Sequence, residues 1–491
     1  MSIQGALLTS LSSLNVLGQQ TNLISNNIAN ANTPGYAQEN LQLSELLGNG
    51  MGSGVVAGQV SVLANDAAAA VANQASGSAA YSQQMSSALA AYTSALGQPS
   101  DTSSLSSQLS AFTTALTTLS ATPADGTAQS GAVNAAQSLT QTFNSLSGSI
   151  SSQREQADQA IAVGVASVNN TLNQLAQNET ARQVAQATGQ STANFINQRS
   201  QLLSNLATEL PIQVHQSGGG GITVTTDRGT TLYDGSVHPL SFTATPVIPS
   251  SMRVTADPSN GLTGGLSQVS ADGQPIAMSQ SGSIAANLQL RDVTLPGFSD
   301  QLDLLAGNLI GTFQTADPTV SAGQAGLFTA GGAALDTTNP AAIAGLAANI
   351  SVNSMVDPSR GGATWRITTG VQAASQGTTS NNSTLIGFVN ALQSSQSATA
   401  IAGLPTAASL SDAVSQVSGD QQAASSTWTS LNTSRTQQAT AAQTALSNQT
   451  GVNIDDQMQR LLIVQQTYQA SAEVIQTASS MMNSLLSIIQ A

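Results

Sequence analysis

The sequence predicts a mainly helical α+β protein, an elongated helical rod whose N- and C-terminal helices pair as a coiled coil. Three observations lead to this prediction. Apolar residues recur at intervals of three and four over long stretches, the interval changes to two after Pro211, and both ends are almost free of charge. Because 40% of the residues are apolar but only 3% are aromatic, aliphatic side chains must form most of the core.

Composition excludes several classes of function. Charged residues make up 7% of the 491 residues, against about 25% in typical domains. The net charge is −14 and all ten basic residues are arginine, which disfavours the clustered basic face that binds nucleic acid or an anionic membrane. The absence of cysteine excludes disulfides, thiolate metal sites and cysteine nucleophiles.

The N-terminus lacks the basic start and continuous apolar core of an ordinary signal peptide. No stretch approaches the roughly 18 apolar residues of a membrane-spanning helix. We therefore expect no membrane insertion, and a chain that is either cytoplasmic or exported by a route that leaves its N-terminus uncleaved.

The first helix is predicted over Ile3–Ile28, because its apolar residues form one stripe. Pro34 and Gly35 should end it in a turn. The glycine-rich stretch Gly48–Gly58 is expected to be a flexible connector that leads into a short strand, VVAGQVSVL. Residues 1–60 would then form the N-terminal half of a terminal coiled-coil domain.

Residues 61–210 are rich in alanine, serine and glutamine and keep helical spacing, which predicts a helical rod domain. Breaks are expected near Gly97–Pro99, over Pro123–Gly131 and at Gly189, where glycine and proline interrupt the pattern. Between these breaks we expect several long helices stacked in a bundle.

Residues 211–284 predict a small β region, because apolar residues alternate there. The stretches IQVHQ, MRVTA and LSQVSADGQPIAM resemble strands, with hairpin turns expected at Asp227–Gly229 and Asp272–Gly273.

Helical spacing then returns. Residues 285–320 would rejoin the rod through a helix over Ser299–Thr312. Residues 321–384 would form a short irregular or β insert with one strand, TWRIT. Residues 385–450 would complete the rod domain, with helical spacing from Ser383 to about Ser447.

Residues 451–491 predict the C-terminal half of the terminal coiled coil. Asn453 is expected to cap the helix, and Asp455 and Asp456 lie in the first turn, where the helix dipole favours anions. The predicted heptad seam consists of Met458, Leu461, Gln465, Tyr468, Ala472, Ile475, Ser479, Met482, Leu486 and Ile489. A seam needs a partner, and the only segment of similar length and character lies at the other end of the chain.

Both ends lack the charges of an ordinary surface helix. Residues 1–38 carry no charged side chain, and residues 461–491 carry only Glu473. An exposed helix face is normally about a quarter to a third charged. Two helices cannot cover each other on all sides, so we infer that identical chains pack around them in a polymer or ring with the paired ends inside.

Two terminal stretches resemble the bacterial flagellar axial proteins. SNNIANANTPGY (Ser25–Tyr36) is similar to their N-terminal signature, and Gly451–Ile489 to their shared C-terminal helix. Internally, Ile196–Val214, Gly229–Gly235 and Gly282–Phe313 resemble the flagellar hook-associated protein 1 family. Gln38 and Ser200 depart from the family pattern, and no ionic contact is carried over to either residue.

This resemblance implies a non-enzymatic structural component of the extracellular flagellum at the junction between hook and filament. Expected partners are other copies in a short ring, the hook protein, a second junction protein and the flagellin filament. Export would use a flagellar chaperone and the flagellar type III apparatus, so the chain would be secreted without a cleaved signal peptide. The alternatives are a hook or rod protein or, from a different class, a secreted hydrolase on a flagellar scaffold.

The asparagines of the first stretch admit two compatible interpretations: their amides cap the helix end locally, or they bond neighbouring subunits. The expected interface and coiled-coil residues are Leu7, Leu11, Leu14, Ile24, Asn26, Asn27, Ile28, Asn30, Asn32, Pro34, Gly35, Tyr36, Leu461, Tyr468, Ile475, Met482, Leu486 and Ile489.

We expect no catalytic, cofactor or metal site. His215 and His238 are the only histidines, and neither has the spacing of a metal site or catalytic triad with Asp227 or Asp234. The four glycines at 218–221 join two predicted strands and precede no Gly-Lys-Ser/Thr, so they are not a phosphate loop.

Overall fold

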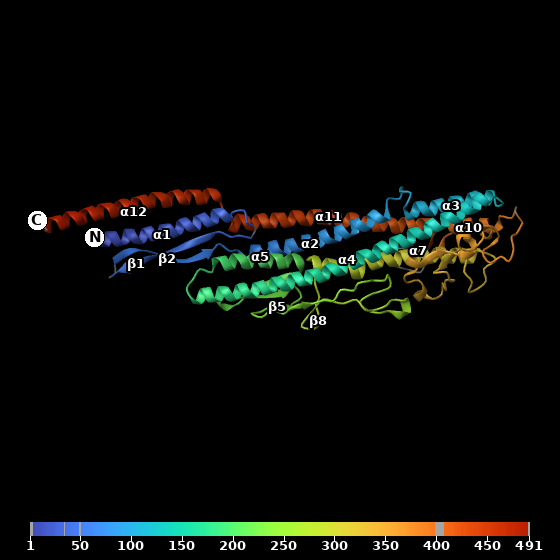
Figure 1. Cartoon of the computed structure of the whole chain (residues 1–491), viewed down its shortest axis with the longest axis horizontal. Coiled ribbons are helices and arrows are strands. Elements are labelled where there is room, and N and C mark those ends of the chain that lie inside the picture. Colours follow the sequence, from blue (N-terminus) through green and yellow to red (C-terminus); the bar gives the residue numbers. More distant parts are fainter. Residues whose placement is uncertain (1–2, 34, 49–50, 379, 398–406, 490–491) are drawn as a thin grey trace.

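The computed structural model describes residues 3–33, 35–48, 51–378, 380–397 and 407–489. The molecule is a long, mostly helical rod with small antiparallel sheets, as predicted (Figure 1). The chain leaves from one tip, runs along the rod and returns, so the two ends lie near the same tip. In the described part, no helix is long and apolar enough to cross a membrane.

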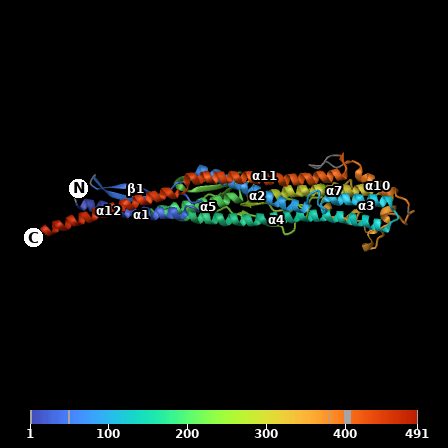
Figure 2. The same ribbon diagram turned by 90° about the horizontal axis from the view of Figure 1, so that it is seen from above.

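The two terminal helices lie side by side, as the charge pattern predicted. Helix α1 (Ile3–Asn30) packs against α12 (Ile454–Ile489) at the tip where both ends lie (Figures 1 and 2). Asn453 caps α12 by accepting from the backbone N–H groups of Asp455 (3.0 Å) and Asp456 (3.3 Å). The predicted helices and cap are confirmed.

A β-hairpin lies against α1, where the sequence predicted a flexible connector. Strands β1 (Glu39–Gly48) and β2 (Met51–Val62) form a long antiparallel ladder, so the glycine-rich stretch is mostly strand. Gly54 shows why the hairpin contains glycine where it approaches α1. Its φ of 148° suits few other residues, and a Cβ at this position would collide with Ser12 of α1. Glycine therefore lets the hairpin approach the helix.

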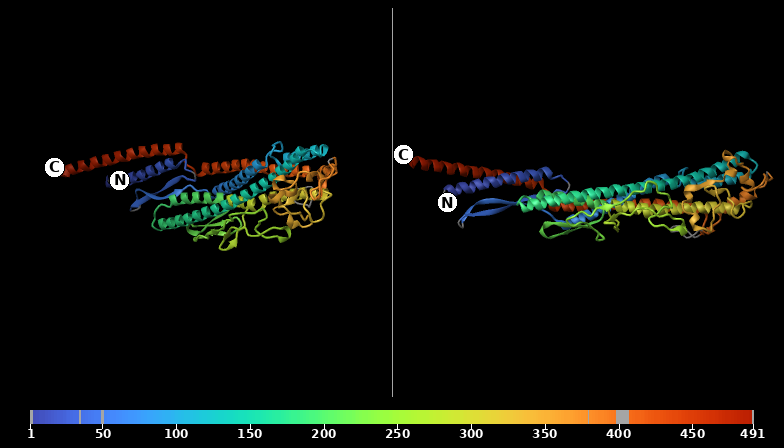
Figure 3. Two further views of the ribbon diagram at one scale, coloured as in Figure 1. Left: turned by 45° about the vertical axis from the view of Figure 1, so that its right-hand side comes forward. Right: turned by 60° about the horizontal axis from the view of Figure 1, so that its bottom comes forward.

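The rod consists of antiparallel helices (Figures 2 and 3). These are α2 (Asp66–Leu96), α3 (Leu105–Ala121), α4 (Gly126–Ala187), α5 (Ala193–Glu209), α6 (Ser283–Gln289), α7 (Leu295–Ala316), α10 (Ser383–Gln393) and α11 (Leu410–Thr450). The predicted breaks are confirmed, except that the second is narrower than Pro123–Gly131. Asp125 caps α4 by accepting from the N–H of Thr127 at 2.8 Å, so the helix begins already at Gly126.

The far end of the rod has an aromatic core despite the low aromatic content. Phe112, Phe313, Phe328 and Phe388 are fully buried, with ring centroids 4.9–5.5 Å apart. Their helices and strands are distant in sequence, so the few phenylalanines of the chain tie α3, α7 and α10 together.

Two small sheets form the β region on one side of the rod. One contains β3 (Ile212–Gln216), β4 (Ile222–Thr226) and β5 (Thr231–Tyr233). The other contains β6 (Leu240–Ser241), β7 (Ser270–Ala271) and β8 (Gln274–Pro275). Both predicted hairpin turns are confirmed. MRVTA is not a strand; its Met252 forms only an isolated bridge with Thr263.

Buried arginines fasten this β region to α4. The Arg154 guanidinium is fully buried and donates to the carbonyls of Pro249, Ser250, Met252 and Arg291. Burial lowers its pKa to about 10. Arg291 pairs with Asp158 of α4 at 2.6 Å. The loop from residue 242 to 253 is thus held by side chains of the longest helix.

Three predictions for the chain beyond residue 282 differ from the structure. The helical return starts at α6, and a π-helical turn, η3 (Leu290–Thr294), joins it to α7. TWRIT is no strand, because it enters the short helix α9 (Arg366–Thr369). The predicted helix from Ser383 to Ser447 is broken between α10 and α11, where β11 (Gln396–Ser397) pairs with β12 (Ala407–Ala408).

The remaining elements are short. They are β9 (Phe328–Ala330), β10 (Ile350–Val352), α8 (Leu346–Asn349), and the 3-10 turns η1 (Gly218–Gly220), η2 (Pro258–Asn260), η4 (Pro340–Ala342), η5 (Ser354–Val356) and η6 (Pro358–Arg360).

Candidate assembly site at the paired ends

The contact between α1 and α12 has a small apolar core. Leu17 and Ile24 of α1 are buried against Val464 of α12, with Leu14, Ile28 and Leu461 packed beside them. Further along the pair, the side-chain hydroxyls of Ser13 and Ser471 lie 3.3 Å apart. An apolar core with three buried side chains is small for two helices of this length, and most residues of α12 are exposed.

The seam of α12 keeps the predicted heptad spacing but in a different register. The residues with the least exposure are Gln457, Leu461, Val464, Ser471, Ile475, Ala478 and Met482. Gln465, Ala472 and Ser479, which we placed in the seam, are exposed. When every second position of the predicted seam is moved by one residue toward the N-terminus, Val464 and Ala478 take the places of Gln465 and Ser479. The two polar interruptions of the predicted seam are therefore absent from the contact.

Asn27 is the centre of a buried hydrogen-bond cluster at the end of α1. Its side chain is 1% exposed. The Asn27 carbonyl oxygen accepts from the hydroxyl of Tyr36 (2.9 Å) and the backbone N–H of Glu39 (3.0 Å). Its amide donates to the carbonyl of Glu39 (2.9 Å) and to the side chain of Gln457 (3.3 Å). One amide thus joins α1, the start of β1 and the start of α12.

The same segment is bound to the rod. Asn197 of α5 accepts from the backbone N–H of Ala37 at 3.1 Å, and its amide donates to the Glu39 carboxylate at 3.3 Å. The N–H of Gln38 donates to the carbonyl of Thr450, the last residue of α11, at 2.7 Å. Residues 36–39 therefore form a junction that fixes the terminal helices against the rod.

Gly35 suits this junction in two ways. Its φ of 76° lies in the left-handed region, which confirms the turn predicted there. A Cβ at this position would also come within 3.0 Å of Gln201 Cγ on α5. Pro34 lies outside the described residues.

The junction holds one buried carboxylate. Glu39 is 6% exposed, and burial raises the pKa of its side chain while the hydrogen bond from Asn197 lowers it. Burial, with the nearby Glu39 charge, raises the pKa of Tyr36 to about 12, so its hydroxyl stays a donor. Gln38, which departs from the family pattern, donates to Asn40 (3.0 Å), whose oxygen also accepts from Arg460 (3.2 Å).

The other asparagines of the signature differ in environment. Asn30 bonds locally, donating to the carbonyl of Asn26 at 3.0 Å and accepting from Thr33 at 3.3 Å. The side chains of Asn26 and Asn32 are exposed. Asn30 therefore caps the helix end locally, and Asn27 joins segments of its own chain. Bonding to a neighbouring subunit stays a prediction for the exposed amides of Asn26 and Asn32.

Among the predicted apolar residues, some are covered within the chain and others are not. Ile24 is buried, whereas Leu7, Leu14, Ile28, Leu461, Ile475 and Met482 are partly buried. Leu11, Tyr468 and Leu486 are about half exposed. The side chain of Ile489 lies outside the described part.

The uncovered residues form an apolar surface at this tip. On α1 and α12 it includes Leu8, Leu11, Leu462, Ile463, Tyr468, Val474, Met481, Leu485 and Leu486, and on the hairpin Leu43, Leu46 and Leu47. Leu47 is 67% exposed and Ile463 62%. A concentration of this kind marks an interaction surface. We call these residues the terminal apolar surface.

Sequence reasoning missed Asn197 and Gln457 as partners of the junction. Neither lies in a local motif, because each acts through contacts with residues distant in sequence. Gln457 precedes Leu461 by four positions, so helical spacing alone could have placed it on the seam.

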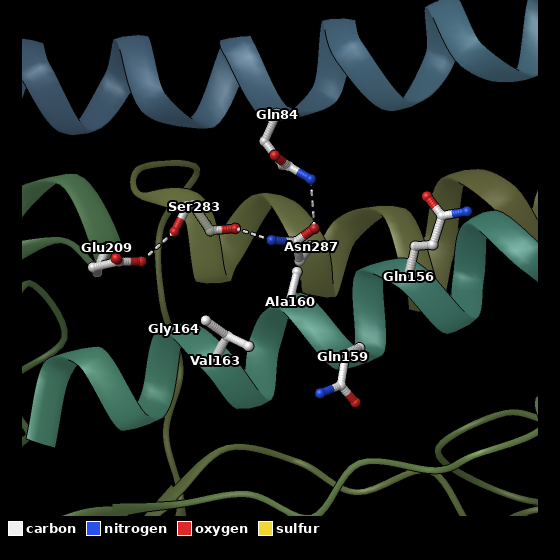
Figure 4. A pocket seen from close by; sticks show the side chains of 9 residues that line it. All are labelled: Gln84, Gln156, Gln159, Ala160, Val163, Gly164, Glu209, Ser283 and Asn287. Carbon is white, nitrogen blue, oxygen red and sulfur yellow. Dashed lines mark hydrogen bonds between the residues drawn. The ribbon is translucent and has the colours of Figure 1, made fainter.

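Outside the paired ends, ionisable groups are sparse. The groove in Figure 4, about 460 Å³, lies between α2, α4 and α6 and is lined largely by glutamine, asparagine and aliphatic residues. Glu209, the single carboxylate of its lining, accepts from the Ser283 hydroxyl at 2.5 Å. His238 bridges the exposed carboxylates of Asp234 (3.4 Å) and Asp272 (2.8 Å), which raise its pKa. Both ring nitrogens face carboxylates, so this group fastens the turns of the two sheets.

The fold and the site together define an elongated, mostly helical protein whose paired ends carry few charges and expose an apolar surface. Three families match the sequence. Residues 89–325 match the flagellar hook-associated protein FlgK helical domain, residues 7–36 the flagella basal body rod protein, and residues 442–488 the flagellar basal body rod FlgEFG protein C-terminal family. The chain thus carries the helical domain of the flagellar hook-associated protein FlgK between N- and C-terminal segments of the flagellar rod type.

One solved structure that resembles the chain is the flagellar hook junction protein FlgK from Burkholderia pseudomallei. The two are 22% identical, with a TM-score of 0.43, over 53% of this chain and 46% of that one. The chain thus spans less than half of that structure. The search of curated proteins found no match.

Proposed function

We propose that this protein is a structural component of the junction between flagellar hook and filament, where copies assemble into a short ring. The observation that carries the proposal is the terminal apolar surface on a chain with the FlgK helical domain. The two ends, which match the flagellar rod families, would supply the surface for self-assembly. The FlgK helical domain favours a hook-associated protein over the other axial components.

The physical driving force for assembly is burial of that surface. Fully burying one leucine, isoleucine or methionine side chain contributes about 1.5–3 kcal/mol. The surface contains several such residues that are about half exposed, so their burial against neighbouring copies would outweigh the cost of association. The lack of charge over residues 1–38 serves the same end, because no ion there has to lose its water.

The proposed partners follow from the position at the junction. The ring would contact the hook protein on one side, and a second junction protein and the flagellin filament on the other. A flagellar chaperone and the type III export apparatus would deliver the chain to the outside. The small core of the terminal pair supports this route, because ends with few internal contacts can stay unfolded until neighbours cover them.

Electron microscopy of a strain without its own junction protein tests the proposal. The full chain should restore filaments to bare hooks, whereas variants lacking residues 1–38 or 461–491 should be exported or accumulate as monomers and leave the hooks bare. A deletion strain that lacks hooks altogether would instead favour a hook or rod protein. Filaments restored by a truncated chain would overturn the role given to the ends.

A further inference from the structure

The side chain of His238 connects the two small sheets of the β region. The residue lies between β5 of the first sheet and β6 of the second. Its Nε2 atom is 3.4 Å from the carboxylate of Asp234, which directly follows β5. Its Nδ1 atom is 2.8 Å from the carboxylate of Asp272, in the turn between β7 and β8. The imidazole thus forms the middle of a bridge from one sheet to the other.

Both contacts can be hydrogen bonds in only one protonation state of the ring. A neutral imidazole has one N–H donor and one acceptor nitrogen, whereas the imidazolium has two donors. An ionised carboxylate can only accept. Two ionised carboxylates at opposite nitrogens are therefore both bonded only when the ring carries both hydrogens. When the ring is neutral, the lone pair of one nitrogen faces a carboxylate oxygen and the two repel each other.

The distances indicate which bond the neutral ring keeps. The Nδ1 contact with Asp272 has the length of an ordinary hydrogen bond, whereas the 3.4 Å from Nε2 to Asp234 exceeds the usual range of about 2.7–3.2 Å. The single hydrogen of the neutral ring should therefore stay on Nδ1. Asp234 also accepts from the backbone N–H of Ser236 at 3.2 Å, so its carboxylate keeps a partner within its own turn when the ring releases it.

We propose that His238 is a proton-dependent clip between the two sheets. With both ring nitrogens protonated, it holds the carboxylates of Asp234 and Asp272 at once. When the Nε2 proton is lost to solvent, the ring keeps Asp272 and releases Asp234, so the turn after β5 moves independently of the second sheet. The side chain of His238 is 28% exposed, which gives this proton access to water.

The direction of the pH effect follows from the groups that face the ring. The hydrogen bond to Asp272 is the largest cause that raises the pKa of His238 from 6.5, the Asp234 carboxylate adds to it, and partial burial opposes both. Because the pKa is higher in the folded than in the unfolded chain, the clip is closed below about pH 6.5 and opens as the pH rises through the folded pKa. The clip lies on the side of the rod, away from the terminal apolar surface (Figure 1), so its action does not depend on the proposed assembly.

Titration of the ring by NMR tests the clip in the full-length chain. The sequence contains only two histidines, so a His215→Gln background leaves a single histidine signal. Asp272→Asn should lower the titration midpoint of His238, and Asp234→Asn should lower it by less. Asp227→Asn is the matched control, because Asp227 precedes β5 at its other end, and it should leave the midpoint where it was.

The nitrogen signals of the same ring identify the tautomer. In the neutral form the hydrogen should reside on Nδ1. A neutral ring with its hydrogen on Nε2 would overturn the inference. A midpoint that neither Asp272→Asn nor Asp234→Asn lowers, or that the control lowers as much as Asp272→Asn, would do the same.

A second NMR experiment measures the motion of the turn. The sequence contains three Asp-Gly pairs, which end at Gly126, Gly235 and Gly273, so pairing a labelled aspartate carbonyl carbon with a labelled glycine nitrogen selects these three amides. Nitrogen relaxation should show Gly235 becoming more mobile as the pH rises through the His238 midpoint, while Gly273 and Gly126 stay unchanged. His238→Gln does not titrate, so its Gly235 should have the same mobility at both ends of the range. Constant mobility of Gly235 in the wild type would mean that the proton does not couple the sheets and that the inference is wrong.

Discussion

Asp303 allows one prediction to be worked out in detail, because it is a buried carboxylate that forms no ion pair within the described part of the chain. It lies on α7, 2% exposed, and accepts from the backbone N–H groups of Gly345 (2.8 Å) and Ala347 (2.7 Å). Burial raises the pKa of its carboxyl from 3.8 to about 7, although these two hydrogen bonds oppose the shift. In this way Asp303 fastens the loop before α8 to the rod.

The sign of the pH effect follows from this shift. Between pH 3.8 and about 7 the folded protein keeps a proton that the unfolded chain has lost, so stability falls as the pH rises through this range. At about 1.36 kcal/mol per pH unit the full span is roughly 4 kcal/mol. Between pH 5 and 8.5 the expected loss is about 2.5 kcal/mol.

The change to test is Asp303→Asn, which keeps the shape and removes the titration. The amide group introduced by this substitution would face one of the two N–H donors, so at pH 5 the variant should be less stable by about 1–3 kcal/mol. Near pH 8.5 this deficit should shrink by about 2.5 kcal/mol or reverse, because the wild type alone has lost stability.

Urea unfolding followed by circular dichroism at both pH values measures this difference directly. Each midpoint should be taken from the transition of the helical rod, because a chain of this size need not unfold in one step. A deficit that is the same at pH 5 and 8.5 would refute the argument, since it would mean that the Asp303 carboxylate is ionised in the fold at both values.

Three further predictions concern packing and the ends. Asn27→Ala should lower the protection of residues 3–28 in assembled flagella and reduce assembly, because it leaves several buried partners unsatisfied at about 1–3 kcal/mol each; unchanged assembly would contradict this. Gly164→Ala should lower the melting temperature, since its Cβ would lie 2.8 Å from Ile284, whereas Gly148→Ala, with no neighbour within 4 Å, should raise it. Hydrogen exchange should show residues 3–28 weakly protected in dilute monomer, and strong protection there would count against assembly-dependent folding.

Long periodic segments of this fold were predictable from sequence, because their signal is local. The apolar stripe over Ile3–Ile28 became α1 with nearly the same bounds, and the two hairpin turns of the β region formed as expected. The glycine-rich stretch after residue 48 was misjudged. Its strand depends on a close approach between Gly54 and Ser12, which composition does not reveal.

The candidate site was predictable in outline and not in its contacts. Charge depletion indicated which segments pack together, yet Asn27 meets Gln457 across most of the chain length, and no local pattern indicates that bond. The register of α12 shows the same limit. Spacing permits both Val464 and Gln465 in the seam, and only the opposite surface of α1 decides between them.

The shared location of the two chain ends has a practical consequence for labelling this protein. A tag or fluorescent protein at either terminus would stand at the tip that carries the terminal apolar surface, which the proposed assembly would bury. The turn between β4 and β5 is the better graft point, because Arg228 there is 62% exposed in its side chain and lies on the side of the rod. Peptides inserted at this turn would leave the terminal apolar surface free.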